Sequence, residues 1–435
     1  MPIVQRQHTR RRMVKLRSIG QSRVLTSTGG RLINRRVTAA EQTKRSYERR
    51  PYPGPDIGKL VGKGGSLPSL KWMQAIGRPD QPEPDRVLVA GCGTGVEAFV
   101  IRRRWPKAEI VAVDFSPRSI AVARRLQRSA GVVRPITFLV ADLTDPELAV
   151  HTGGRFDLIT CHGVLSYIPK PGKVLTHFAA CLRPGGALYL GVNGESHPAT
   201  RLRPWLERFG LDVVEMKDER RLRELLRLWD CLHDDGARDF ATMSASYLAG
   251  DICGPHFNNW PMDRWRSEAN RCGWEVAGVW LLPLALRLTI EHGNHSPLFP
   301  AGIGEVAERL DRARPAGFHK IVLRRAKPGE LDVEFGKNSE RRLRWTGLYS
   351  VRFVRLPGSG TSTAVLRCPT FNLRLDWPLT AGQVETLRTL VDSGVFPIGW
   401  QRHWIRSEAS RRILWLWTGL GVVTISRIAC PPAST

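Results

Sequence analysis

The sequence predicts an α/β protein: a doubly wound, mostly parallel seven-stranded sheet with an inserted helical region and a small C-terminal α+β domain. Three observations lead to this fold class. Apolar, strand-like runs alternate with helix-like segments from residue 85 to 193, and two more strand-like runs follow at 274–282 and 319–325. Strands joined by helices form parallel sheets. The first run ends in the glycine-rich stretch GCGTG, and acidic residues end the second and third.

The first predicted strand covers Val87 to Ala90, whose composition is typical of a strand buried on both faces. Glycines at 91, 93 and 95 then allow a sharp turn and a close approach of the backbone to a ligand. In open α/β sheets, ligands bind at this end of the strands. A tight strand-to-helix turn without a ligand is the alternative interpretation of the glycines alone.

The following elements alternate in the same way. Ser116 and Pro117 predict a helix start, and Gly131 predicts its end. The RPGG segment at 183–186 predicts a turn into the fifth strand. The helices are expected at 97–105, 117–130 and 174–182, and the strands at 109–115, 136–142, 156–163 and 187–192.

Composition divides the chain into four regions. We expect a basic, disordered arm at 1–45, a lead-in segment at 46–84 with a helix at 67–76, and a main domain at 85–327. Leucines among many charges predict an inserted helical cap at about 195–260. Residues 328–435 form an accessory domain with strands near 345–356 and 364–375, a helix from Thr380 to Gly394, and a helix and strand after residue 411.

The net charge of +26 is concentrated at the N-terminus, since residues 1–50 contain 14 Lys and Arg residues against two acidic ones. A disordered basic arm explains this composition most simply. An organellar presequence, or an untranslated extension before Met13, is an alternative. Electrostatics would allow the arm to bind nucleic acid, but we do not favour that function.

Other classes are disfavoured by composition. No window approaches 18 uninterrupted apolar residues, so we expect no membrane span. Eight scattered cysteines without a CxxC pair favour reduced thiols and a cytoplasmic location. Zinc is disfavoured because Cys231, His233, Cys253 and His256 follow no finger spacing. The oligomeric state cannot be inferred.

The acids at the strand ends predict a nucleoside site. Asp114 follows the glycines by about 20 residues, where a carboxylate binds both hydroxyls of a ribose. Asp142 would face the exocyclic amine of adenine, and Phe115 and Leu143 would sandwich the base. Val96 stands where the GxGxxG pyrophosphate fingerprint requires glycine, which favours S-adenosylmethionine over a dinucleotide.

The whole set resembles the class I, Rossmann-like S-adenosylmethionine-dependent methyltransferases over about residues 85–193. The matching motifs, in order, are VLVAGCGTG, VAVDFSP, VADLTD, FDLITCHGVLSYIP and LRPGGALYLGV. The resemblance implies a loop of Ala90, Gly91, Cys92, Gly93 and Gly95 around the methionine moiety of the cofactor. It also implies Asp114 on the ribose and Asp142 with Leu143 at the adenine. Phe115, against the base, and His162, beside the cofactor, are further candidate contacts.

Two further segments resemble one bacterial subgroup of this family. YERRPYPGPD is similar to an element that precedes the core, and DFATMSASYLAGDICGPHFNNW to one that lies over the substrate side. Tyr52, between two prolines, is then a candidate lid residue, although a plain linker explains it equally well. The C-terminal domain resembles the winged-helix-like module of certain bacterial protein lysine methyltransferases.

The cofactor would supply an activated methyl group, and the protein would align it with the acceptor. A general base is needed only when the nucleophile must lose a proton, and His162 and Tyr167 are the candidates. The CHGV motif at 161–164 differs from the NPPY type that methylates base amines. We expect a protein or small-molecule acceptor; an RNA methyltransferase and a non-catalytic scaffold are the alternatives.

Overall fold

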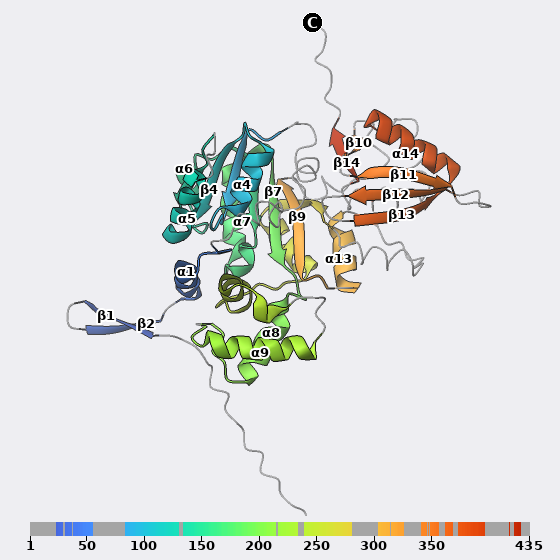
Figure 1. Ribbon diagram of the computed structural model, residues 1–435. Coiled ribbons are helices and arrows are strands. Elements are labelled where there is room, and N and C mark those ends of the chain that lie inside the picture. Colours follow the sequence, from blue (N-terminus) through green and yellow to red (C-terminus); the bar gives the residue numbers. More distant parts are fainter. Residues whose placement is uncertain are drawn as a thin grey trace, which may run out of the picture.

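The computed structural model describes most of the predicted main domain and parts of both ends (Figure 1). The described residues are 23–28, 31–36, 38–54, 83–129, 134–214, 216–233, 239–280, 303–313, 315–325, 341–345, 347, 349–355, 362–368, 373–395, 417 and 422–427. The predicted helix at 67–76 lies outside these residues, as does most of the lead-in segment.

The N-terminal region contains regular structure. Strands β1 (Arg23–Thr28) and β2 (Arg31–Arg36) pair as an antiparallel hairpin, which Figure 1 shows apart from the main domain. Helix α1 (Ala39–Arg49) begins at Thr38, whose hydroxyl oxygen and the Glu41 carboxylate form a capping box. Regular structure is thus present within the predicted arm at 23–28, 31–36 and 39–45, and the division of the chain at residue 45 stays a prediction.

The main sheet has seven strands in the order β5-β4-β3-β6-β7-β9-β8. The five strands from β5 to β7 are parallel to one another, and β9 and β8 are antiparallel to their neighbours, so the sheet is mixed. The α/β class and the seven strands are confirmed. Their bounds are β3 Arg86–Ala90, β4 Glu109–Asp114, β5 Thr137–Val140, β6 Phe156–His162, β7 Leu182–Asn193, β8 Trp274–Val279 and β9 Phe318–Arg325.

The RPGG segment at 183–186 lies within the bounds of β7, and the chain turns there before the regular part of the strand. Leu182 pairs with Phe156 and Ala187 with Leu158, so 183–186 stand opposite the single residue Asp157 of β6. Gly185 has φ of +78°, a conformation that favours glycine. The predicted turn is therefore present as an irregular start of β7.

Helices connect the parallel strands as predicted. Trp274 on β8 donates an indole hydrogen bond to the Leu175 carbonyl in α7 at 3.0 Å, which fastens a helix to the antiparallel end of the sheet. The connecting helices are α4 (Val96–Arg104), α5 (Pro117–Ser129), α6 (Leu148–Thr152) and α7 (Pro171–Cys181), with α11 (Met262–Arg271) and α13 (Ile303–Ala313) beside the antiparallel strands.

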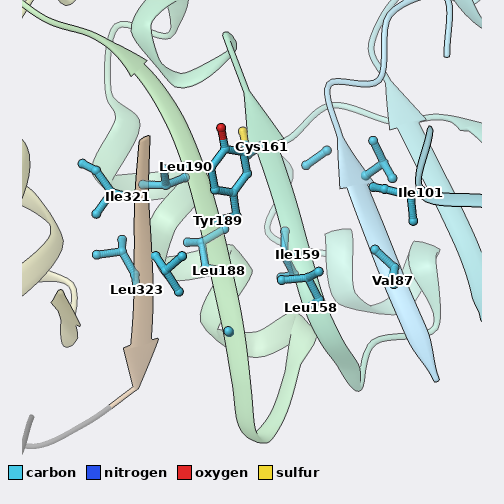
Figure 2. Packing of buried hydrophobic residues seen from close by; sticks show 14 of the residues in the cluster. Val87, Ile101, Leu158, Ile159, Cys161, Leu188, Tyr189, Leu190, Ile321 and Leu323 are labelled. Carbon is cyan, nitrogen blue, oxygen red and sulfur yellow. The ribbon is translucent and has the colours of Figure 1, made fainter. Parts of the chain in front are cut away.

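The core lies between the sheet and its helices (Figure 2). Val87, Ile159, Leu188 and Ile321 come from neighbouring strands, and each is at most 2% exposed. Because both faces of a parallel sheet are covered by helices, its strands are apolar throughout. This burial explains why the first strand was recognisable from composition alone.

The inserted region is helical, as predicted, and has a separate cluster of buried apolar residues. It contains α8 (Pro198–Arg208), α9 (Glu219–Leu232), the short turns η2 (Phe240–Thr242) and α10 (Ala245–Tyr247), and the π-helical turn η3 (Leu248–Ile252). Figure 1 shows α8 and α9 together on one side of the main domain, with α1 beside it.

The C-terminal region combines strands with one described helix. Strands β11 (Ser350–Arg355), β12 (Ser362–Cys368) and β13 (Leu373–Leu379) form an antiparallel sheet, and β10 (Arg341–Trp345) pairs with β14 (Val423–Arg427). Helix α14 (Ala381–Ser393) starts and ends at the predicted caps, Thr380 and Gly394. The predicted helix after residue 411 lies almost wholly outside the described residues. None of the described helices is long and apolar enough to cross a membrane.

Candidate cofactor and methyl-transfer site

The glycine loop begins where β3 ends, and it is held against the neighbouring strand. The N–H groups of Gly91 and Cys92 both donate to the carbonyl oxygen of Val113 in β4, at 2.8 and 2.9 Å. Gly91, Gly93 and Gly95 have φ of +71°, +52° and +98°, and Gly95 is the N-cap of α4. Since L-residues rarely adopt positive φ, the backbone requires glycine here. Ala90 and Cys92 beside them are buried.

Two of these glycines are also required by close contacts within the protein. A Cβ on Gly91 would lie 2.4 Å from Cγ2 of Val164, and one on Gly93 would lie 2.5 Å from the carbonyl oxygen of Tyr52. The N–H of Thr94 donates to the same Tyr52 oxygen at 3.0 Å. The absence of side chains at Gly91 and Gly93 therefore lets the segment after β6 and the lead-in segment pack directly against the loop. The sequence did not indicate this second reason for glycine.

Asp114 ends β4 directly beside the loop. Its Oδ2 accepts a hydrogen bond from the N–H of Gly93 at 2.9 Å, and its Oδ1 accepts one from the N–H of Ser116, also at 2.9 Å. The side chain is 7% exposed. Burial raises the pKa of this carboxyl from 3.8 to about 6, against the lowering effect of the two N–H donors. A buried carboxylate at this position has the character required of a ribose ligand.

Asp142 lies two residues beyond β5, the strand that pairs with β4. It is exposed, and its Oδ1 accepts hydrogen bonds from the N–H and the hydroxyl of Thr144, both at 2.8 Å. Leu143 is buried, and its carbonyl oxygen lies 3.0 Å from Nδ1 of His177. Phe115 contacts the ring of Tyr47 edge-on, with centroids 5.9 Å apart. The structure thus brings the predicted adenine and ribose residues to one edge of the sheet.

His162 ends β6 on the other side of the loop. Its Nδ1 lies 2.7 Å from the hydroxyl of Tyr189, and its ring packs against Tyr189 and Phe318. Burial lowers the pKa of the imidazole from 6.5 to about 3. A neutral imidazole that already contacts the Tyr189 hydroxyl is better suited to lining the site than to accepting a proton. The geometry favours the lining role, and the role of a base stays a prediction.

Tyr167, the other predicted base, is hydrogen-bonded to a carboxylate. Its hydroxyl donates to Oδ1 of Asp251 at 2.5 Å. Burial and the nearby Asp251 carboxylate raise the pKa of this phenol well above its ordinary value, so it keeps its proton. The candidate lid residue, Tyr52, donates its hydroxyl to the other oxygen of Asp251 at 3.0 Å.

Asp251 and Tyr47 were missed in the sequence. Asp251 belongs to the inserted segment that resembles a substrate-side element, but nothing in the spacing singles it out among the acids of that segment. Tyr47 lies in the YERRPY motif with Tyr52, and their rings meet edge-on at 6.5 Å. Among the described side chains, no group of three or more His, Cys, Asp or Glu is arranged to hold a metal.

Known proteins are similar to this chain over much of the main sheet. Residues 88–188 match the family model described as a methyltransferase domain. The chain carries a class I S-adenosylmethionine-dependent methyltransferase domain. The family predicted from the sequence is confirmed, and the matched residues run from Leu88 in β3 to Leu188 within β7. The bacterial subgroup stays a prediction.

The chain spans less than half the length of the two curated relatives described here. An uncharacterised protein from Synechococcus sp. is 39% identical over 157 residues, which are 34% of this chain and 36% of that protein. A ubiquinone biosynthesis O-methyltransferase from Xanthomonas axonopodis is 34% identical over 112 residues, 26% of this chain and 44% of the enzyme.

The solved structure of PKMT2 from Rickettsia typhi in complex with AdoHcy superposes with a TM-score of 0.50. It covers 83% of this chain and 76% of PKMT2, at 16% sequence identity. At that identity the likeness concerns the fold alone. It extends beyond the matched methyltransferase domain, since the domain model covers residues 88–188 only.

Proposed function

We propose that this chain is an S-adenosylmethionine-dependent methyltransferase. The observation that carries the proposal is the buried Asp114 carboxylate, hydrogen-bonded to Gly93 of the glycine loop. In the proposed complex Asp114 binds the ribose hydroxyls, and Asp142 and Leu143 lie at the adenine with Phe115 nearby. The loop from Ala90 to Gly95 surrounds the methionine moiety, with His162 lining the same edge of the sheet.

The charge of the site supports this cofactor. Although the chain carries a net charge of +26, the groups that act on the phenols and on Asp114 around the loop are acidic. Burial is the main cause that raises the pKa of Tyr47 and of Tyr52, and nearby carboxylates add to it: Asp251 and Asp114 for Tyr47, and Asp251 and Glu97 for Tyr52. An acidic site suits the sulfonium and ammonium groups of S-adenosylmethionine, whereas the pyrophosphate of a dinucleotide would be repelled.

Bound there, the cofactor supplies an activated methyl group on its sulfonium sulfur. The contribution of the chain is alignment, which can provide up to about 7–11 kcal/mol when reacting groups are held in line. Tyr52 and Val164 approach the loop closely and restrict the space beside it. The helical insertion at 195–260 is proposed to cover the acceptor side, as a cap.

Calorimetric titration of the full chain with S-adenosylmethionine and S-adenosylhomocysteine tests the proposal. Saturable binding of both is expected. Absence of heat with either ligand, for protein shown by circular dichroism to be folded, would favour a scaffold that has lost cofactor binding.

The remaining assignments follow from the same proposal. A protein side chain or a small molecule is the favoured acceptor, and RNA is the alternative. Residues 328–435 are proposed to be an accessory module of the winged-helix-like type. Membership of the bacterial subgroup is also proposed, and the YERRPYP element supports it. The free cysteines among the described residues support a cytoplasmic location. Binding of nucleic acid through residues 1–45 is not favoured.

A further inference from the structure

Asp251 lies where three segments of the chain meet. It belongs to η3 in the inserted region, and its two carboxylate oxygens accept hydrogen bonds from Tyr167 at 2.5 Å and Tyr52 at 3.0 Å. Tyr167 follows β6 of the main domain, and Tyr52 comes from the lead-in segment. One carboxylate therefore joins the core, the lead-in segment and the cap.

Tyr47 adds a third aromatic ring to this group. Its ring meets Tyr52 edge-on, and the pKa of its hydroxyl is raised by burial, by Asp251 and by Asp114. Gly250 gives the rings room, because a Cβ there would lie 3.3 Å from Cδ2 of Tyr52 and 3.4 Å from the Tyr47 hydroxyl oxygen. We call Asp251, Tyr47, Tyr52 and Tyr167 the tyrosine cluster.

The tyrosine cluster adjoins the proposed position of the cofactor on two sides. The Tyr52 carbonyl oxygen accepts a hydrogen bond from the N–H of Thr94 in the glycine loop. Tyr47 contacts Phe115, the residue after Asp114. Strands β3, β4 and β6, from which these parts extend, are neighbours in the sheet. The cluster therefore covers the edge of the sheet near the methionine end of the cofactor.

A half-buried carboxylate held by two phenol hydroxyls is suited to bind an ammonium group. A charged hydrogen bond between an ammonium group and a carboxylate is stronger than one between neutral partners. The same surroundings disfavour anionic acceptors such as carboxylates and phosphates.

We propose that the methyl acceptor is a primary amine, held by Asp251 within the tyrosine cluster. This inference rests on the proposed function and names the substrate class of that site. The arriving ammonium group takes the place of the Tyr52 hydroxyl, whose bond to Asp251 is the longer of the two. Tyr167 holds the carboxylate in position.

The step balances without a further reactant. One proton of the bound ammonium group passes to the Asp251 carboxylate and from there to solvent. The lone pair of the neutral amine forms a bond to the methyl carbon, while the carbon–sulfur bond breaks and its electron pair stays on sulfur. A methylated ammonium product and a neutral thioether result.

Sinefungin tests the proposal without the natural acceptor, since it carries an amine on carbon where the cofactor carries a methyl group on sulfur. Titration calorimetry compares its affinity for the full chain with that of S-adenosylhomocysteine. We expect sinefungin to bind at least about tenfold more tightly, the effect of one charged hydrogen bond. Equal affinities overturn the amine proposal, whereas failure of both ligands to bind overturns the proposed function.

Substitutions test whether Asp251 is the residue that causes the preference for sinefungin. Asp251→Asn is expected to abolish the preference for sinefungin and to retain binding of S-adenosylhomocysteine, which also shows that the variant is folded. Tyr52→Phe is expected to keep the preference, because it removes only the hydroxyl that the amine displaces. Glu224→Gln, a matched change of an exposed acid in the cap, is the control. A preference that survives in Asp251→Asn overturns the proposal.

The chemistry of the product gives an independent test. An extract of cells lacking the protein is incubated with the full chain and methyl-tritiated S-adenosylmethionine, and the products are hydrolysed. Label on nitrogen, in an amino acid or in a small amine, supports the proposal and separates the two sources. Label in base-labile esters, in O-methyl products or in RNA overturns it, as does no incorporation by protein that binds S-adenosylhomocysteine.

Discussion

The N–H of Gly93 donates a 2.9 Å hydrogen bond to Oδ2 of Asp114. This bond joins the glycine loop after β3 to the carboxylate at the end of β4, so the two features that define the candidate cofactor site form one unit. Because Ser116 donates to the other oxygen, the carboxylate is held in a single orientation. Substitutions in the glycine loop and at Asp114 should therefore affect cofactor binding in the same direction.

Asp114→Ala is expected to weaken binding of S-adenosylhomocysteine at least about tenfold, since buried polar partners are left unpaired. Titration calorimetry measures the loss, and circular dichroism checks the fold. Asp145→Ala, in the loop after β5, is the control and should bind normally. Unchanged affinity in Asp114→Ala would mean that the ribose lies elsewhere.

Asp114 should also make the stability of the ligand-free protein depend on pH. Its folded pKa of about 6 exceeds the ordinary 3.8, so the folded state holds the extra proton between these values. Stability from this group is therefore present below about pH 4 and is lost as pH rises through about 6. Relative to Asp114→Asn, the free energy of unfolding should fall by about 2 kcal/mol from pH 4 to pH 7. Urea unfolding of both proteins measures this, and parallel pH profiles would contradict it.

His162 and Tyr189 are expected to act as a structural pair. His162→Leu leaves the buried Tyr189 hydroxyl without its 2.7 Å partner and should reduce the free energy of unfolding by about 1–3 kcal/mol. His162→Leu with Tyr189→Phe removes both polar groups and should recover much of the loss. Chemical denaturation of these two variants and of Tyr189→Phe alone provides the comparison, and strictly additive losses would argue against the pair.

The two loop glycines should differ in how they can be rescued. Gly91→Ala places a Cβ against the Val164 side chain, and Gly93→Ala places one against the Tyr52 carbonyl. Each should cost about 2 kcal/mol or more, from positive φ and overpacking. Val164→Ala should partly restore Gly91→Ala. No side-chain change at residue 52 should restore the stability of Gly93→Ala, because the clash is with the backbone carbonyl of Tyr52. Thermal unfolding of the single and double variants measures these differences in stability.

Truncation should separate the N-terminal arm from α1. A chain of residues 38–435 is expected to bind S-adenosylhomocysteine as the full chain does, since it keeps Tyr47 and Tyr52. A chain of residues 55–435 loses both tyrosines and the Thr94 contact, and should bind at least about tenfold more weakly. Equal binding by all three would show that residues 38–54 are not part of the site.

Several features of this protein follow from its sequence alone. Buried parallel strands are apolar throughout, so Val87 to Ala90 was recognisable without any partner strand. Gly91, Gly93 and Gly95 need conformations that other residues avoid, and Asp114 follows at a spacing set by one crossover. Capping residues such as Thr380 and Gly394 gave helix ends correctly, because caps depend on neighbouring residues only.

The tertiary structure decided what depends on distant contacts. Tyr52 and Asp251 are separated by 199 residues, and no local pattern indicates that they meet. His162 and Tyr167 looked like bases because their ordinary chemistry allows it, but burial and a neighbouring carboxylate control their protons. Backbone geometry and apolar periodicity are local properties. Desolvation and pairing arise only when segments far apart in the sequence pack together.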